Sequence, residues 1–410
     1  MTTSLRTRAG ITGALALTCA GLTSLAVAAP ATAATPDGAT GAHFLASELA
    51  AGGDHLSVSS GGSSFPDYGL TIDAVLGLDA AKNGQSAATR AASYITKNAA
   101  AYRTGGDTKE LYAGATAKLL VFAQAQGLPG DTYLNDLKTL EQSTGQFKDK
   151  SAYGDYSNTI GQSLAIIGLT RAGKPDAKAV DFLAKQQCND GGFRMTFDGS
   201  CTGDTDATSL AVQALSAAGG HDAAIGKAVN FIAGNQQGSG GVVEPAAQAA
   251  PNTNSTGLAA VAFTLAGKTS EAAKAKSFVS GLQFGCSAPA ALRGGYAFDQ
   301  KSFDAQSAKG SKATAGDKEL RASTQAMLAV NPQPYLEVSA GGAATAPALS
   351  CATTAPSSTA TATSTTTGPP IITDGPAAGG NHGVLLAGAA ALGGAALAGA
   401  GLRRRLRSED

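Results

Sequence analysis

The chain has 410 residues, and its 30 Lys and Arg balance 30 Asp and Glu, so the formal net charge is zero. Balanced charge, with no basic cluster in the central region, argues against nucleic acid as a partner. Residues 40–337 are long enough for one large hydrophobic core or two small ones.

The N-terminal residues have the pattern of a secretion signal. Arg6 and Arg8 precede an apolar run over residues 11–27, and small residues ending in Ala33 follow. A basic start, an apolar centre and a small-residue end are typical of a signal peptide that is removed on export. We therefore predict a signal peptide over residues 1–33 and exclude it from the fold.

The region between residues 40 and 337 contains an internal repeat. In each of six segments a threonine opens a run of Ala, Leu, Val, Ile and Gly that is apolar on most faces, as in a helix buried on all sides. These threonines are Thr71, Thr116, Thr159, Thr208, Thr256 and Thr324. Five of the runs end at or beside a glycine, as helix C-caps commonly do.

An amphipathic helix follows most of these runs, with apolar residues such as Val180 and Leu183 at helical spacing. Residues 41–51 supply the remaining outer helix, and a loop over residues 285–316 lengthens the last interval. The alternation predicts an all-α fold, an α6/α6 toroid of six inner and six outer helices. An open solenoid is the alternative, but helices that are apolar all round need neighbours on every side.

The cysteines outside the signal peptide are even in number. They are Cys188, Cys201, Cys286 and Cys351. An even count in an exported protein suggests two disulfides, and the most local pairing joins Cys188 to Cys201 and Cys286 to Cys351. The spacing fits no zinc pattern, so we predict no metal site.

The C-terminal part has the composition of a stalk and a membrane anchor. Residues 338–382 are rich in Thr, Ser, Ala, Pro and Gly and are predicted to form a disordered low-complexity stalk. Residues 383–402 are uncharged and long enough to cross a bilayer as one helix. The basic tail at 403–410 then marks the cytoplasmic side, which places the domain on the extracytoplasmic face. A cell-wall sorting signal is the alternative, although no Leu-Pro-x-Thr-Gly motif precedes it.

Two neighbouring stretches resemble a known repeat. Residues 186–193 read Gln-Gln-Cys-Asn-Asp-Gly-Gly-Phe, and residues 204–215 read Asp-Thr-Asp-Ala-Thr-Ser-Leu-Ala-Val-Gln-Ala-Leu. They resemble the squalene cyclase-like repeat of terpenoid cyclases and protein prenyltransferase β-subunits, with weaker echoes at residues 236–241 and 283–296. The resemblance spans residues 40–330 and implies the same α6/α6 toroid, in an exported bacterial protein. That toroid also occurs in vitamin B12 carriers and complement thioester domains.

The catalytic signatures of this family are incomplete in the chain. The cyclase acid motif is Asp-x-Asp-Asp, whereas residues 204–207 read Asp-Thr-Asp-Ala. Cyclases surround carbocations with aromatic faces, but the chain has no Trp and only 5% aromatic residues. The histidines of the domain, His43, His55 and His221, do not form a zinc cluster with Asp and Cys, and the thioester motif is absent. We therefore expect no cofactor and favour a non-enzymatic role.

Asp204 and Asp206 are the candidate catalytic acids if the protein is an enzyme, because a carboxylate pair in an apolar cavity can retain a proton. The alternative is N-capping of a helix. Asp73 and Lys118 each lie two residues after their threonine and are predicted to form a structural ion pair on adjacent inner helices.

Three tyrosines and one arginine near the inner-helix starts are candidate ligand-binding residues. Tyr68, Tyr112 and Tyr156 would form an aromatic wall on one side of the toroid mouth, and Arg321 would face them. Such a wall suits a planar or carbohydrate ligand. The alternative is that the tyrosines pack between neighbouring helices.

These observations favour a membrane-anchored, non-catalytic protein that binds a small molecule or an envelope protein at one mouth of the toroid. The first alternative is a terpenoid cyclase or prenyltransferase-like enzyme that uses Asp206. The second is a structural spacer in the cell envelope.

Overall fold

The structure is a computed structural model that describes residues 37–60, 62–245 and 250–351. The predicted signal peptide, transmembrane helix and basic tail, and the stalk beyond residue 351, lie outside these residues. Within the described ranges, no helix is long and apolar enough to span a membrane.

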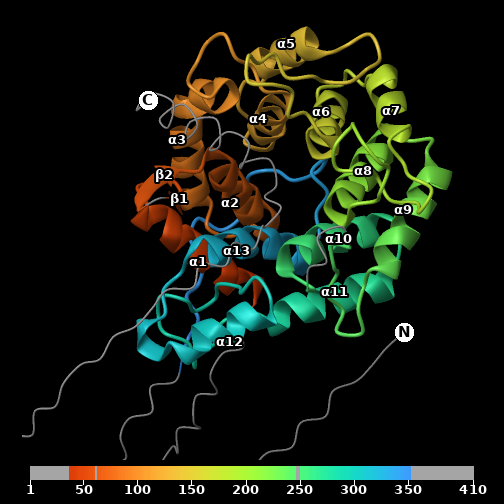
Figure 1. The fold of residues 1–410 in the computed structure, drawn as a ribbon. Coiled ribbons are helices and arrows are strands. Elements are labelled where there is room, and N and C mark those ends of the chain that lie inside the picture. The colour runs from red at the N-terminus through yellow and green to blue at the C-terminus, as the bar shows by residue number, and fades with distance from the viewer. Residues whose placement is uncertain (1–36, 61, 246–249, 352–410) are drawn as a thin grey trace, which may run out of the picture.

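Six helices of the described chain form a closed inner ring (Figure 1). They are α2 (Tyr68–Ala81), α4 (Ala113–Ala125), α6 (Thr159–Arg171), α8 (Thr205–Ala218), α10 (Thr253–Leu265) and α13 (Asp317–Val330). Each packs against the next, and α13 packs against α2. Because each also has an outer neighbour, most of its residues are buried whichever way they point, which accounts for the apolar sequence on all faces. The ring is closed, as predicted, rather than an open solenoid.

The second layer surrounds this ring. It comprises α1 (Gly38–Ala51), α3 (Gln85–Thr104), α5 (Asp131–Leu140), α7 (Ala177–Ala184), α9 (Asp222–Gly234) and α11 (Thr269–Gly281). These helices bury one stripe only, and in α9 the buried residues are Ala228, Val229 and Ile232. The predicted amphipathic pattern is therefore confirmed.

Two short features were not predicted from the sequence. The interval 285–316, expected to be a loop, contains α12 (Gln300–Ala308) and a 3-10 turn (Gly310–Lys312). An antiparallel hairpin of β1 (Ser57–Ser60) and β2 (Ser63–Pro66) precedes α2. Neither interrupts the ring.

The glutamines of the repeat motif join one helix pair to the next. The Gln187 side-chain amide donates to the Ala224 carbonyl at the start of α9 (2.8 Å), and Gln236 donates in the same way to Glu271 in α11 (2.9 Å). Gly240 lies in the turn that follows Gln236 and has a φ of +91°. A Cβ added to it would lie 2.3 Å from a carbonyl oxygen of α11. A side chain does not fit there, so glycine is required.

Four of the six aligned threonines occupy one position, the fourth residue of an inner helix. They are Thr71, Thr116, Thr208 and Thr256. Each hydroxyl donates to the carbonyl of the capping residue four positions earlier. In three of them it also accepts a backbone N–H from the segment before the helix.

The alignment was wrong at the other two helices. In α6 the fourth residue is Gln162, which accepts from the Phe147 backbone N–H (3.0 Å). Thr159 is the first residue of α6, and its hydroxyl donates forward to the Arg194 carbonyl. In α13 the equivalent acceptor is Ser323, one residue before Thr324. A hydroxyl can satisfy backbone groups at either end of the first helical turn, so threonine alone does not fix the register.

Residues 331–351, which we name the strap, cross the C-terminal end of the ring. The Tyr335 N–H donates to the Gln213 side chain (3.0 Å), and Arg171 donates to the Val338 carbonyl (3.0 Å). The Ala340 N–H donates to the Ala125 carbonyl (2.7 Å). Residues 338–351 are therefore packed against the domain, although the sequence assigned them to the stalk.

Both predicted disulfides are confirmed. Cys188 is bonded to Cys201, within the loop that precedes α8. Cys286 is bonded to Cys351 and fixes the far end of the strap to the segment after α11. Each of the four cysteines is therefore bonded to its neighbour in the sequence, as the most local pairing predicted.

Candidate functional site

One side chain from each inner helix lies at the same depth along the ring axis. We name this set the axial layer, and it consists of Asp73, Lys118, Leu164, Leu210, Leu258 and Gln325. Each lies two residues after the Thr, Gln or Ser described above, which is the fourth residue of every inner helix except α13. Three adjacent helices, α13, α2 and α4, contribute polar groups, and the other three contribute leucines. The layer therefore has a polar half and an apolar half.

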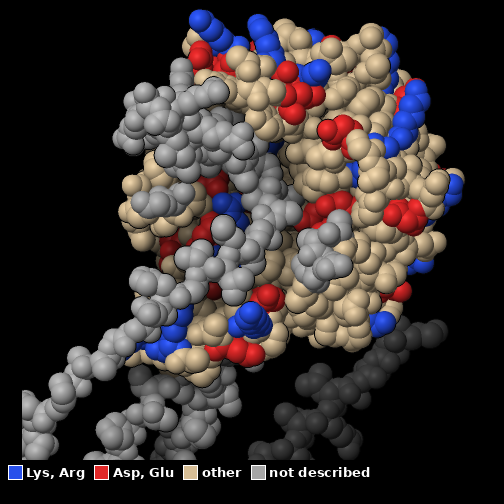
Figure 2. Space-filling model, in the orientation of Figure 1, with Lys and Arg blue, Asp and Glu red and all other residues tan. Residues whose placement is uncertain are grey.

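A pocket lies on this layer and opens toward the N-terminal ends of the inner helices. The pocket has a volume of about 80 Å³, measured as the space open to the centre of a water molecule. Tyr112, Tyr156 and Asn158 lie at its rim. Figure 2 shows charged groups of both signs near the centre of this face of the molecule. Water needs roughly 10–15 Å³ on this measure, so the pocket has room for several waters or a small ligand ring.

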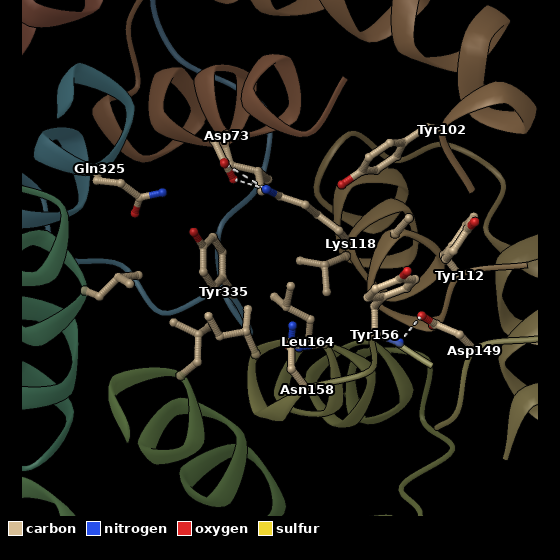
Figure 3. A pocket seen from close by; sticks show the side chains of 18 residues that line it. Asp73, Tyr102, Tyr112, Lys118, Asp149, Tyr156, Asn158, Leu164, Gln325 and Tyr335 are labelled. Atoms are coloured by element: carbon tan, nitrogen blue, oxygen red, sulfur yellow. Dashed lines mark hydrogen bonds and ion pairs between the residues drawn. The ribbon is translucent and has the colours of Figure 1, made fainter. Parts of the chain in front are cut away.

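Tyr335 enters the pocket from the strap. Its side chain stands near the ring axis, and its hydroxyl points toward Gln325 and Asp73 (Figure 3). Because the strap covers the opposite end of the ring, Tyr335 forms part of the pocket floor. The ring is consequently a cup with one mouth rather than an open channel.

The charged groups of the axial layer are paired. The Lys118 ammonium lies 2.7 Å from the Asp73 carboxylate, and both side chains are about nine-tenths buried. Burial raises the pKa of Asp73, and the adjacent ammonium opposes that rise. The predicted ion pair is confirmed, and it lies in the pocket wall.

Two phenols of the pocket, those of Tyr102 and Tyr335, have raised pKa values. Burial raises the pKa of Tyr102, and the Asp73 carboxylate raises it further. The same two causes raise the pKa of Tyr335. Both hydroxyls therefore keep their protons and can donate as well as accept hydrogen bonds.

Several of these polar groups lack a partner within the described residues. Gln325 is 4% exposed, and its Oε1 accepts no hydrogen bond there. The hydroxyls of Tyr102 and Tyr335 make no hydrogen bond to a described residue either, but they are accessible from the pocket rather than enclosed. Buried polar groups in folded proteins are nearly always satisfied by protein, water or ligand. The pocket thus presents hydrogen-bonding capacity that the described residues do not use.

The three tyrosines of the predicted aromatic wall are not equivalent. Tyr112 and Tyr156 line the pocket, and Tyr156 is 41% exposed. Tyr68 does not line the pocket, because its ring packs against the rings of Tyr94 and Tyr102, with ring centroids 6.3 and 6.1 Å apart. Tyr68 is the first residue of its helix, Tyr112 is a capping residue, and Tyr156 lies two residues before a cap. The misaligned register explains why they were grouped.

Arg321 lies outside the pocket lining. Its guanidinium donates to Asp67 (2.8 Å) and to Asp317 (3.0 Å). Asp67 in turn caps α2 by accepting from the Leu70 N–H (2.9 Å). Arg321 thus connects the starts of α13 and α2, and a role in ligand binding stays a prediction.

The two candidate acids lie at the start of α8, outside the pocket lining. Asp204 accepts from the Ala207 N–H (2.8 Å), which confirms the capping interpretation. Burial, together with the charges of Asp206 and Glu244, raises the pKa of Asp204. Burial and the Glu244 charge also raise the pKa of Asp206. The pair can therefore retain a proton, but it does not face the pocket.

Gln325, Tyr102 and Tyr335 are among the pocket residues that were not recognised in the sequence. Gln325 follows from the repeat only once Ser323, rather than Thr324, is aligned. Tyr102 belongs to an outer helix and reaches inward past Gly69. Tyr335 lies in a segment with no periodic pattern. In the ranges that the structure describes, no group of three or more His, Cys, Asp or Glu is placed to bind a metal ion.

No protein-family model matches the sequence, and no curated protein matches it. Among solved structures, the chain is similar to the type II terpene cyclase MstE from Scytonema in its apo form, with a TM-score of 0.52 and 15% identity over 73% of this chain and 97% of that one. A variant of MstE in complex with the product merosterolic acid A gives 0.50 and 15% over 72% and 96%. A protein from Actinoplanes gives 0.50 and 13% over 72% and 98%.

The fold is therefore of the terpene cyclase type, as the repeat predicted. The likeness covers nearly the whole length of those structures. At such low identities it concerns the fold alone, so the function has to be argued from the pocket itself.

Proposed function

We propose that the protein is an exported, membrane-anchored α/α toroid that binds a small molecule in the axial pocket without catalysing its conversion. The observation that carries the proposal is the polar half of the axial layer, above all the buried Gln325 with an unsatisfied Oε1. Leaving such a group without a partner costs about 1–3 kcal/mol. A bound molecule recovers that free energy when the Gln325 amide turns its oxygen toward the pocket and the molecule supplies the donor.

The placement of the acids supports binding rather than acid catalysis. A general acid has to reach the atom that it protonates. Asp204 caps α8, and neither Asp204 nor Asp206 lines the pocket. The proposed ligand would instead meet an ion pair, an amide and neutral phenols.

The proposed location is the outer face of the membrane. The signal-peptide pattern and the apolar segment at residues 383–402 support it, as do the two disulfides, which persist mainly in oxidising compartments. External protease added to intact cells should release the domain by cleavage within residues 352–382. Protection of the full chain until the cells are lysed would contradict this location.

Native mass spectrometry of the full-length protein, released from its own membranes in detergent, tests the binding function. We expect a bound small molecule that survives gentle ionisation. A library of small fragments, screened by ligand-observed NMR, provides the second measurement. If no molecule co-purifies and no fragment binds, the protein has no small-molecule function and the structural spacer becomes the better explanation.

A cyclase activity is the second candidate function. The raised pKa of Asp206 and the fold favour it. One solved MstE variant contains the substrate geranylgeranyl dihydroxybenzoate, which is therefore a suitable probe. Formation of a cyclised product by the wild type, and not by Asp206→Asn, would replace the binding proposal with an enzymatic one.

A further inference from the structure

The polar half of the axial layer also identifies the class of ligand, provided that the pocket is a binding site as proposed. We infer that the ligand is an uncharged, hydroxyl-rich molecule of sugar-ring type. Charge, hydrogen-bonding capacity and the two-sided lining lead to this inference separately.

The charged groups of the lining already have partners within the protein. Lys118 is paired with Asp73, so an anionic ligand finds no unpaired cation in the described lining. Asp149, the other carboxylate there, accepts from the backbone N–H groups of Ala113 (2.7 Å) and Tyr156 (2.9 Å). A cationic ligand would have to compete with these partners. Burying an unpaired charge is costly, so the pocket favours a ligand without one.

The unsatisfied groups match hydroxyls better than other polar groups. The phenols of Tyr102 and Tyr335 can each donate and accept, and the Gln325 amide does both. A sugar hydroxyl also donates and accepts, so several adjacent hydroxyls can satisfy this mixed set. A carboxylate or a carbonyl only accepts and would leave the Gln325 oxygen without a donor.

The other side of the pocket suits the C–H face of a sugar ring. Leu164, Leu210 and Leu258 form the apolar half of the layer, and the half-exposed Tyr156 stands at the rim. An aromatic ring packs well against an apolar surface while its hydroxyl stays in contact with water. A molecule with hydroxyls on one edge and C–H groups on its faces can therefore contact both halves at once.

Sugars of similar size that differ in charge test this inference. Glucose, galactose, mannose and arabinose are titrated against glucosamine and glucuronate by saturation-transfer NMR, using the full chain in a detergent without a sugar headgroup. We expect at least one neutral sugar to bind about tenfold or more tightly than both charged analogues. Tighter binding of glucosamine or glucuronate would overturn the inference.

The fragment library separates this inference from the proposed function. If fragments of other chemistry bind and compete with one another at the pocket while no sugar binds, the ligand class is wrong and the binding function stands. If neither sugars nor fragments bind, both are wrong.

Two glutamine variants link binding to the axial layer. Gln325→Leu replaces an amide in the polar half of the axial layer by an apolar side chain and should weaken sugar binding about tenfold or more. Gln124→Leu, on α4 but outside the lining, is the matched control and should bind as the wild type does. Equal affinity of Gln325→Leu and wild type would overturn the inference.

Tyr335→Phe serves if Gln325→Leu fails to fold, since it removes one oxygen and keeps the ring in place. Its affinity should fall several-fold, with an unchanged thermal unfolding temperature. An unchanged affinity in the folded Tyr335→Phe protein would likewise contradict the inference.

Discussion

At the scale of single residues, Asp79 makes stability depend on pH. This carboxyl group of α2 is fully buried, its Oδ1 has no partner in the described residues, and the Gln126 amide donates to its Oδ2. Burial raises the pKa of Asp79 to about 7, although the side-chain amides of Gln85 and Gln126 and, more weakly, the nearby cationic charges lower it. The folded state therefore holds a proton that the unfolded chain, with a pKa of 3.8, has released.

The consequence is a loss of stability as the pH rises. Between about pH 4 and pH 7 the folded state binds more protons than the unfolded state, so the free energy of unfolding falls by at most about 1.4 kcal/mol per pH unit from this group. Asp79→Asn cannot ionise and should flatten this slope. Urea unfolding at pH 5 and pH 8 measures it. Equal slopes in variant and wild type would show that Asp79 is not the responsible group.

At the scale of helices, a glycine contact sets the distance between α4 and α6. A Cβ on Gly161 would lie 2.9 Å from the Gly114 Cα, so alanine there has to push the helix backbones apart. Overpacking of this kind typically costs about 1–3 kcal/mol. Both glycines also line the pocket. Gly161→Ala should therefore lower the thermal unfolding temperature and narrow the pocket mouth.

Gly226→Ala is the matched control for this helix contact. Gly226 lies on the exposed face of α9 with no heavy atom within 4 Å of its added Cβ. Alanine should stabilise an exposed helix by about 1 kcal/mol because it restricts the unfolded chain. If Gly161→Ala proved as stabilising as Gly226→Ala, the close approach of α4 and α6 would not exist in solution.

The same scale shows why the sequence predicted the ring but only part of the pocket. Runs that are apolar on most faces locate all six inner helices, and glycine marks the end of five of them, because burial on every side leaves a strong pattern. The sequence predicts the alignment of the inner helices less well, because Thr159 and Thr208 make different backbone hydrogen bonds at different positions of the first turn. Because the alignment of α13 was wrong by one residue, Gln325 was not recognised as a residue of the axial layer.

The strap shows the limit of sequence analysis more clearly. Tyr335 is held by Gln213 and Arg171, which are 122 and 164 residues away in the chain. The sequence around Tyr335 has no periodicity, and the residues from 338 onward have a composition that also suits a disordered stalk. Only the assembled ring creates the surface on which this segment is ordered.

At the scale of the whole molecule, the Cys286–Cys351 disulfide joins the strap to the segment that follows α11. The bonded cysteines are 65 residues apart, against 13 for Cys188 and Cys201. In the loop-entropy model, these separations correspond to about 4 and about 3 kcal/mol of stabilisation at 25 °C. Replacing Cys286 and Cys351 by serine should therefore lower the free energy of unfolding more than the same change at the other pair.

Ligand affinity should respond differently from stability in that variant. The backbone of Tyr335 is fixed by Gln213 and Arg171 near the end of α13, far along the strap from Cys351. Without the disulfide, the end of the strap is freed first, while the pocket floor keeps its contacts. Titration of the serine variant with the best-bound molecule should give the wild-type affinity at a reduced unfolding free energy. A parallel loss of affinity would mean that the redox state of Cys286 and Cys351 affects the pocket through the strap.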